Sequence, residues 1–306
     1  MGVFSPGSLL RETYRGWVPL PVRESVYEAV SRAWAIGESR VTGCLGLSIE
    51  DWWNDPAARR MAERLRQLRG RYAGRRCVIQ GNGPSLNEMD LEVFADEFVW
   101  GSNRAYLLYD RISWRHAFYV GVDTRVIPDI APELMDWVAR LPRTQFFFPY
   151  RFRSGGVLRG APNIVWYPEV VPRDNPVGGR PFSRSCSWWV SSVNTVTLAA
   201  LQLAVHMGFS PIYLIGCDTS YTVPDSVRIE DGDAKKLIST DDDPNHFDAS
   251  YFGAGRKWHD PQVHRMIQNY EVAKRVCDEL GVEVYNATVG GQLEVFPRVD
   301  YRKVFG

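Results

Sequence analysis

Short apolar runs alternate with segments of helical periodicity from about residue 73 onward, and most of the runs end at glycine, asparagine or aspartate. The predicted strands are Cys77–Ile79, Glu97–Gly101, His116–Val120, Thr144–Phe148, Ile164–Tyr167, Ile212–Ile215 and Val282–Tyr285. The predicted helices are Met89–Asp96, Asn194–Met207 and Gln262–Leu280, the last with Gly281 as its C-cap. This alternation is typical of parallel sheets with helices on both faces. Residues 73–306 are therefore predicted to form an α/β domain with a Rossmann-like, doubly wound, mostly parallel sheet.

The first 72 residues lack this alternation and are predicted to form an N-terminal helical extension. Val22–Ala35 and Asp51–Leu68 have helical spacing, and Asp55-Pro56 marks a helix start. The span Arg59–Arg76 is rich in arginine, and Glu63 is the one acidic residue within it. The arginines are Arg59, Arg60, Arg64, Arg66, Arg69, Arg71, Arg75 and Arg76. We favour a solvated helix face. A surface for anionic lipid headgroups or an anionic acceptor is the alternative.

The first predicted strand runs into Gly81-Asn82-Gly83-Pro84-Ser85-Leu86. The two glycines permit positive φ and a close approach of a ligand, and Pro84 suits the first position of a helix. Such a turn would leave backbone N–H groups and a positive helix end facing an anion, while Asn82 adds an amide that donates and accepts. An ordinary strand-to-helix turn is the alternative, but the full string favours a nucleotide site.

Four polar residues come directly after predicted strands. They are Asn82, Asn103, Asp123 and Asp218. The carboxyl ends of parallel strands form the edge of the sheet where ligands bind. The sequence therefore predicts a binding site there, although asparagine and aspartate also favour turns.

Residues 222–257 show no periodicity, are acidic and contain Gly253-Ala254-Gly255. A long segment of this kind is predicted to be a mobile lid without regular structure. Its acidic triplet, Asp241–Asp243, is a candidate for cation binding. We favour a solvated loop because no known ligand spacing is matched.

His259 follows this lid, in Trp258-His259-Asp260-Pro261, at the predicted boundary of the last long helix. Asp260 suits the capping position. The other histidines lie elsewhere: His206 and His264 on predicted helices, His116 on a predicted strand and His246 in the lid. Histidine titrates near pH ~6.5 in model peptides; a helix N-terminus favours a neutral ring, whereas the neighbouring Asp260 favours a charged one. His259 is therefore the preferred general base, with Asp218 and Asp123 as the competing carboxylates.

Composition adds the cellular setting. The chain has 306 residues, 45% of them hydrophobic and 24% charged, with a formal net charge of zero. This balance gives no electrostatic indication of a nucleic-acid partner, and none is expected. Five scattered cysteines without a Cys-x-x-Cys pair favour a reducing compartment. With no run of ~20 apolar residues and no signal peptide, the chain is predicted to be cytoplasmic. Peripheral contact with the inner face of the membrane, through Arg59–Arg76, is left open, as is homo-oligomerisation.

Three stretches together resemble the bacterial lipooligosaccharide sialyltransferases. They are Gly81–Leu86, the segment Ser191–Asp218 that ends in Ile-Tyr-Leu-Ile-Gly-Cys-Asp, and the turn that carries His259. The first two also resemble the 6-hydroxymethylpterin diphosphokinase-like (MptE-like) domains. The resemblance covers roughly residues 75–290 and leaves the N-terminal segment unexplained.

The resemblance to the sialyltransferases implies roles for individual residues. Asn82 and Asn103 would hold a CMP-sugar, and Asp123 stands where the family has asparagine, so the base or sugar can differ. A hydroxyl near the start of the long helix would touch the nucleotide, and tyrosines would support the departing phosphate, while His259 would be the base. The hydroxyl candidates are Ser192, Thr195 and Thr197, and the tyrosine candidates are Tyr221 and Tyr251. Tyr221 lies one residue later than the pattern expects.

Three hypotheses follow. The first is a glycosyltransferase that moves a sugar, CMP-linked by preference, to a glycan hydroxyl in surface-polysaccharide synthesis, without an obligatory metal. The second is an ATP-dependent diphosphotransferase that uses Mg²⁺ bound by Asp123, Asp218 and Asp241–Asp243. The third is a non-catalytic nucleotide-sugar binder. The first is favoured because of the glycine turn.

Overall fold

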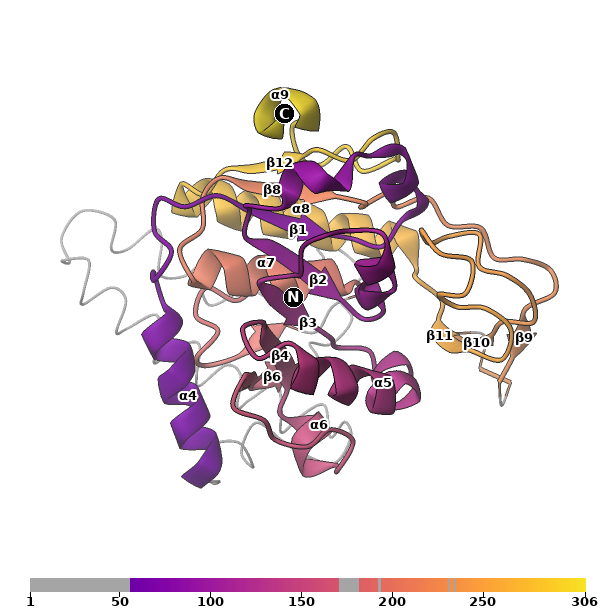
Figure 1. Ribbon diagram of the computed structural model, residues 1–306, viewed down its shortest axis with the longest axis horizontal. Coiled ribbons are helices and arrows are strands. Elements are labelled where there is room, and N and C mark those ends of the chain that lie inside the picture. The colour runs from indigo at the N-terminus through magenta and orange to yellow at the C-terminus, as the bar shows by residue number, and fades with distance from the viewer. Residues whose placement is uncertain (1–55, 171–181, 192–193, 231, 234) are drawn as a thin grey trace, which may run out of the picture.

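The computed structural model describes residues 56–170, 182–191, 194–230, 232–233 and 235–306. Seven parallel strands form its central sheet in the order β12-β8-β1-β2-β3-β4-β5 (Figure 1). The strands are β1 (Cys77–Gln80), β2 (Val99–Ser102), β3 (Phe118–Val120), β4 (Gln145–Pro149), β5 (Ile164–Tyr167), β8 (Ile212–Ile215) and β12 (Val284–Asn286). The predicted Rossmann-like α/β fold is confirmed. Predicted and observed strands overlap throughout, and their ends differ by no more than two residues.

Helices flank the sheet, and several of them are absent from the prediction. The observed ones are η1 (Pro84–Glu88), η2 (Leu91–Phe94), η3 (Ala105–Asp110), α5 (Val126–Arg140), α6 (Arg151–Ser154), α7 (Val196–His206), α8 (Val263–Leu280) and α9 (Tyr301–Phe305). The helix predicted over Met89–Asp96 is observed as the four-residue 3-10 helix η2, which Asp90 caps. The α5 helix was not predicted, because Pro128 and Pro132 interrupt its pattern. Gly281 ends α8 at a φ of 70°, as predicted.

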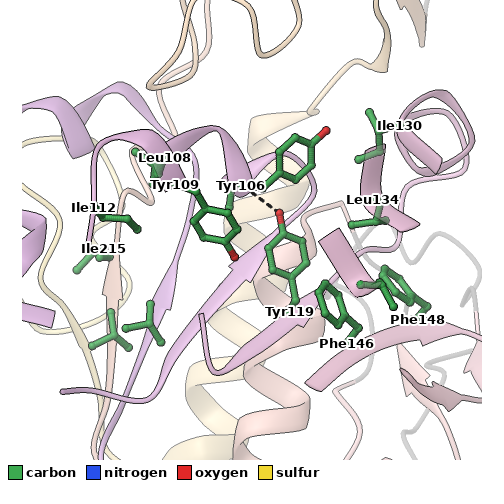
Figure 2. Close-up of a cluster of buried hydrophobic side chains, with 14 of the residues drawn as sticks. Tyr106, Leu108, Tyr109, Ile112, Tyr119, Ile130, Leu134, Phe146, Phe148 and Ile215 are labelled. Carbon is green, nitrogen blue, oxygen red and sulfur yellow. Dashed lines mark hydrogen bonds between the residues drawn. The ribbon is translucent and has the colours of Figure 1, made fainter. Parts of the chain in front are cut away.

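Alternate residues of each strand serve the two faces of the sheet. Val78, Tyr119 and Phe146 pack beneath η1, η2, η3 and α5, whereas Ile79, Phe118 and Phe147 pack beneath α7 and α8. Figure 2 shows the first layer, in which the hydroxyl of Tyr119 accepts a hydrogen bond from the backbone N–H of Tyr106. The strands are apolar on both faces because both faces are covered.

The helix α4 (Pro56–Leu68) lies beside strand β5 and begins at the predicted proline. Ala62, Leu65 and Leu68 are buried, and Arg64 donates from Nη1 to the Ile164 carbonyl at 2.8 Å. Arg66 pairs with Glu63 at 2.6 Å, so part of the arginine-rich face is neutralised within the chain. The predicted helix Val22–Ala35 falls outside the described residues. In the described part of the chain, no helix combines the length and hydropathy needed to cross a bilayer.

The predicted lid is folded, which corrects the expectation of an irregular segment. It contributes β9 (Arg228–Ile229), β10 (Lys236–Ile238) and β11 (Lys257–His259), which form an antiparallel sheet in the order β11-β10-β9. Phe247, Tyr251 and Trp258 are buried, and the backbone N–H of Phe247 donates to the Asn82 carbonyl at 3.0 Å. The strands are too short to produce a visible alternation in the sequence.

A small parallel pair of strands lies between β5 and α7 in the sequence. Strand β6 (Glu169–Val170) pairs with β7 (Val190–Ser191). Residues 171–181 fall outside the described residues.

Candidate functional site

The strand order reverses between β1 and β8. Strands β2 to β5 follow on one side of β1, and β12 lies beyond β8 on the other. Open α/β sheets bind ligands at such a point, outside the carboxyl ends of the strands. A cavity of about 420 Å³ lies there, between the strand-end turns, the N-terminal ends of α5, α7 and α8, and the folded lid.

Most of the residues predicted for the site line this one cavity. They are Gly81, Asn82, Gly83, Asn103, Asp123, Thr195, Thr197, Asp218, Tyr221, Tyr251 and His259. Pro84 and Ser85 lie behind the wall, and Ser192 falls outside the described residues. The fold therefore brings together residues that are up to 178 positions apart in the sequence, from Gly81 to His259.

The glycine turn packs directly on the turn that follows β8. A Cβ at Gly81 would lie 2.2 Å from the Gly216 carbonyl oxygen, and one at Gly83 would lie 1.8 Å from Asp218 Oδ2. The N–H of Gly81 donates to Ile215 at 2.7 Å, and that of Gly83 to Gly216 at 2.9 Å. Close packing, rather than positive φ, requires glycine here, since Gly83 has φ −69°.

The protein itself uses most of the backbone donors at this turn, which does not favour the predicted phosphate cradle. Pro84 opens only the five-residue 3-10 helix η1, so little helix dipole faces the cavity here. The N–H groups of Gly81 and Gly83 bond to Ile215 and Gly216, and that of Ser85 donates to Asp218 Oδ1 at 3.2 Å. A phosphate subsite elsewhere in the cavity fits these bonds better.

Asn82 and Asn103 bring amide groups to the cavity. Asn82 donates from Nδ2 to Ser102 Oγ at 2.9 Å. Its Oδ1, like that of Asn103, is buried and has no hydrogen-bond partner among the described residues. Leaving a buried acceptor unpaired costs about 1–3 kcal/mol, so such atoms are unusual and favour a ligand that donates to them after a small rotation.

His259 forms a pair with Asp123. Its Nδ1 lies 2.9 Å from Asp123 Oδ2, and Asp123 Oδ1 accepts from the N–H groups of Arg125 at 2.6 Å and Val126 at 3.0 Å. Burial would raise the pKa of Asp123, but the bonds from His259 and the two N–H groups outweigh it and hold that pKa below its usual value. The ionised carboxylate only accepts, so Nδ1 carries a proton and Nε2 of the neutral ring is the proton acceptor.

The position of His259 corrects two predicted details. It ends β11, and α8 begins at Val263, so His259 does not lie at the helix boundary. The carboxylate that binds its ring is Asp123, whereas Asp260 accepts from the N–H of Gln262 at 2.9 Å. The orientation of the ring therefore comes from Asp123, which the N–H groups at the start of α5 hold in place.

Asp218 has a structural role, which weakens its candidacy as the base. Its Oδ2 accepts from Ser85 Oγ at 2.7 Å, and its Oδ1 accepts from the N–H of Ser85. Burial raises the pKa of Asp218, and the two bonds from Ser85 oppose this rise. The carboxylate fastens η1 to the turn after β8.

Tyr221 and Tyr251 both line the cavity and flank His246, a histidine of the predicted lid. The Tyr251 ring stacks on His246 with centroids 4.0 Å apart and an interplanar angle of 3°, and the Tyr221 ring meets it edge-on at 6.2 Å. Burial raises the pKa of both tyrosines. The Tyr251 hydroxyl accepts from the N–H of Arg104 at 3.5 Å.

Positive groups also line the cavity. Thr195 caps α7, where its Oγ1 accepts from the N–H of Thr197 at 3.3 Å, and the first turn of α8 also reaches the cavity. Lys235, Arg151 and Arg265 line it as well. None of these three cations was predicted, because no local pattern sets them apart from surface residues. These cations and the N-termini of α7 and α8 suit an anion.

The carboxylates proposed for Mg²⁺ are occupied by other bonds. Asp123 binds His259, Asp218 binds Ser85, and Asp243 accepts from the N–H groups of Asn245 at 2.8 Å and Phe252 at 2.9 Å. Asp241 and Asp242 are exposed, whereas the buried position of Asp243 contradicts a wholly solvated triplet. Within the described residues, no three His, Cys, Asp or Glu side chains come together as a metal site.

Comparison with known proteins adds little. No family model matches the chain, and no curated protein sequence does. Among solved structures, the chain is similar to the MAf glycosyltransferase from Magnetospirillum magneticum AMB-1, with 14% identity and a TM-score of 0.45. The match covers 79% of this chain and 38% of that one, so the chain spans less than half the length of that glycosyltransferase. A likeness this distant does not assign an activity.

Proposed function

We propose that this chain is a glycosyltransferase that moves a sugar from a nucleotide-activated donor, preferably CMP-linked, to a glycan hydroxyl. The observation that carries the proposal is the His259–Asp123 pair, with Nδ1 and Oδ2 2.9 Å apart, at a cavity that also contains Asn82 and Asn103. The motif resemblance to the lipooligosaccharide sialyltransferases supports the CMP-linked donor and a surface polysaccharide as acceptor.

In the proposed reaction, the acceptor hydroxyl attacks the anomeric carbon of the sugar. Nε2 of His259 takes the hydroxyl proton as the new C–O bond forms and the bond to the phosphate oxygen breaks. The positive charge that appears on the ring is stabilised by Asp123, which α5 holds in place through two N–H groups. Proton removal of this kind contributes about 10²–10⁴-fold to the rate.

The donor would lie across the cavity. Hydroxyl or amino groups of the nucleoside or sugar would donate to the amide oxygens of Asn82 and Asn103. The phosphate would face the N-termini of α7 and α8, near Thr195 and Lys235. In this orientation the phosphate binds near the N-termini of α7 and α8 and not at the glycine turn.

A thermal-shift panel tests the proposal. CMP, CDP, UDP, GDP and ATP are each added with Mg²⁺ or with EDTA, since a ligand that binds the native state raises the melting temperature. We expect CMP or CDP to give the largest shift and EDTA to leave it intact. A response confined to ATP with Mg²⁺ would instead favour the diphosphotransferase.

A further inference from the structure

A second imidazole–carboxylate pair borders the same cavity. His246 Nδ1 lies 2.7 Å from Asp243 Oδ2, and His246 lines the cavity together with His259. The two pairs are built alike: in each, Nδ1 faces an aspartate that backbone N–H groups hold in place. The role assigned to His259 leaves the second pair without a function.

The surroundings fix the His246 ring in one orientation. Asp243, whose side chain is 2% exposed, accepts from Nδ1 and from the N–H groups of Asn245 and Phe252. Tyr251 covers one face of the ring at 4.0 Å, and Tyr221 and Phe252 meet it edge-on. The titratable side chains in contact with the ring are the carboxylate of Asp243 and the phenols of Tyr221 and Tyr251. A proton on Nδ1 held by Asp243 leaves Nε2 as the ring nitrogen that makes no hydrogen bond to the described residues.

We propose that His246 is a second catalytic residue, which binds the departing phosphate through Nε2–H. The inference rests on the proposed function and adds to it. The electron pair of the breaking bond goes to the phosphate oxygen of the nucleoside monophosphate. In this proposal His246 lies between Asp243 and the phosphate, and these two anions favour a proton on both ring nitrogens, so Nε2–H donates a hydrogen bond to that oxygen. His259 accepts the proton of the acceptor hydroxyl. Atoms and charges balance, and the products are the glycoside and the nucleoside monophosphate.

This arrangement gives His246 the role that the resemblance to the sialyltransferases implies for tyrosines. The Tyr251 side chain is 1% exposed, and its hydroxyl is next to the Arg104 backbone, where it serves the packing of the lid. The pKa of Tyr251 is raised by burial, which makes its hydroxyl a weaker acid. A charged imidazole is a stronger donor to an anionic oxygen than a neutral phenol.

The test compares the affinities of CMP and cytidine, which differ by the phosphate. Calorimetry is run on the full chain, on His246→Phe, which keeps a ring for Tyr251 to stack on, and on His246→Gln. His264→Gln is the matched control, because His264 is exposed on α8, where it bonds to Gln268. We expect both His246 variants to lose about tenfold or more of the preference for CMP, the effect of one charged hydrogen bond, while cytidine affinity and the control stay unchanged.

The outcomes separate the two proposals. An unchanged preference for CMP in both His246 variants overturns the role of His246 and leaves the glycosyltransferase proposal standing. Failure of the parent chain to bind CMP overturns the proposed function itself. If the His246 variants do not fold, NMR of the histidine rings in the parent chain is the test. We expect CMP, but not cytidine, to shift the His246 ring resonances. If CMP leaves these resonances unchanged, the proposed role of His246 is refuted.

Discussion

His116 and His259 show how one residue type serves two regions of the same sheet. His116 precedes β3 inside the apolar layer, where it is 1% exposed, and its Nδ1 lies 2.9 Å from the Tyr109 hydroxyl. Burial lowers the pKa of His116 to about 3. His259 lies at the carboxyl edge, with 36% of its side chain exposed and an aspartate as its partner.

The difference lies in what each ring can do with a proton. The neutral partners of His116, Tyr109 and Gln80, cannot stabilise a charged ring in an apolar layer. Asp123 can stabilise the charge that His259 acquires, and the exposed part of the ring can meet a ligand. The partner and the distance from the strand end thus separate a packing histidine from a candidate base.

Replacing His259 should give the largest effect. We expect His259→Ala to lower kcat for sugar transfer by about 10²–10⁴-fold, because no other group takes the acceptor proton, and to retain CMP binding. Steady-state kinetics beside calorimetry measures both quantities. If His259→Ala keeps most of its kcat while Asp218→Asn loses it, the base is the aspartate.

Asp123→Asn should cost less, about 10²-fold in kcat, because the ring remains but loses the anionic partner that stabilises its charge. The asparagine oxygen still accepts from Arg125 and Val126, so the melting temperature should hardly change. Asp123→Ala, in contrast, removes these bonds before α5 and should also lower the free energy of unfolding by about 1 kcal/mol. Equal unfolding free energies for the two variants would contradict this division of roles.

His116 predicts a loss of stability in mild acid. Its folded pKa is about 3, below the unfolded value, so between those values the unfolded chain binds a proton that the folded chain excludes. The free energy of unfolding should therefore fall as pH drops from about 6.5, by at most about 1.4 kcal/mol per pH unit from this group. Urea titrations at pH 7 and pH 5 on the parent chain and His116→Phe measure it. The variant should lose about 2 kcal/mol less over this interval, and identical losses would rule the explanation out.

Asn82→Ala is expected to give the smallest effect, about a tenfold weaker affinity for CMP with little change in melting temperature, since it deletes one acceptor at the ligand. Asn87→Ala is the control, because Asn87 lies on η1 and bonds to Phe247 and Arg111. Equal CMP affinities in the two variants would reduce Asn82 to a turn residue.

The sheet and the composition of its carboxyl edge were predictable from the sequence, because a strand buried on both faces leaves a local signal. The run Ile212–Ile215 and the aspartate after it need no long-range information. The reason for glycine at positions 81 and 83 was not predictable, since it depends on the turn after β8. Helix α5 was concealed by its two prolines.

Pairings between distant residues could not be predicted. His259 and Asp123 are 136 residues apart, and nothing near either of them indicates the other. His246 was missed for a different reason. Its aspartate is three residues away, but the stacking on Tyr251 that fixes the ring belongs to a lid whose strands of two or three residues carry no periodicity.

The sequence distance between His259 and Asp123 also sets when the site can exist. During synthesis on the ribosome, Asp123 emerges with the first half of the chain, together with Asn82 and Asn103. His259 emerges more than a hundred residues later. Strand β8, which the glycine turn packs against, is also synthesised after Asp123. A nascent or truncated chain that stops before residue 259 therefore carries the amides of the site without its imidazole. The imidazole–carboxylate pair can form only after residue 259 has been added to the chain.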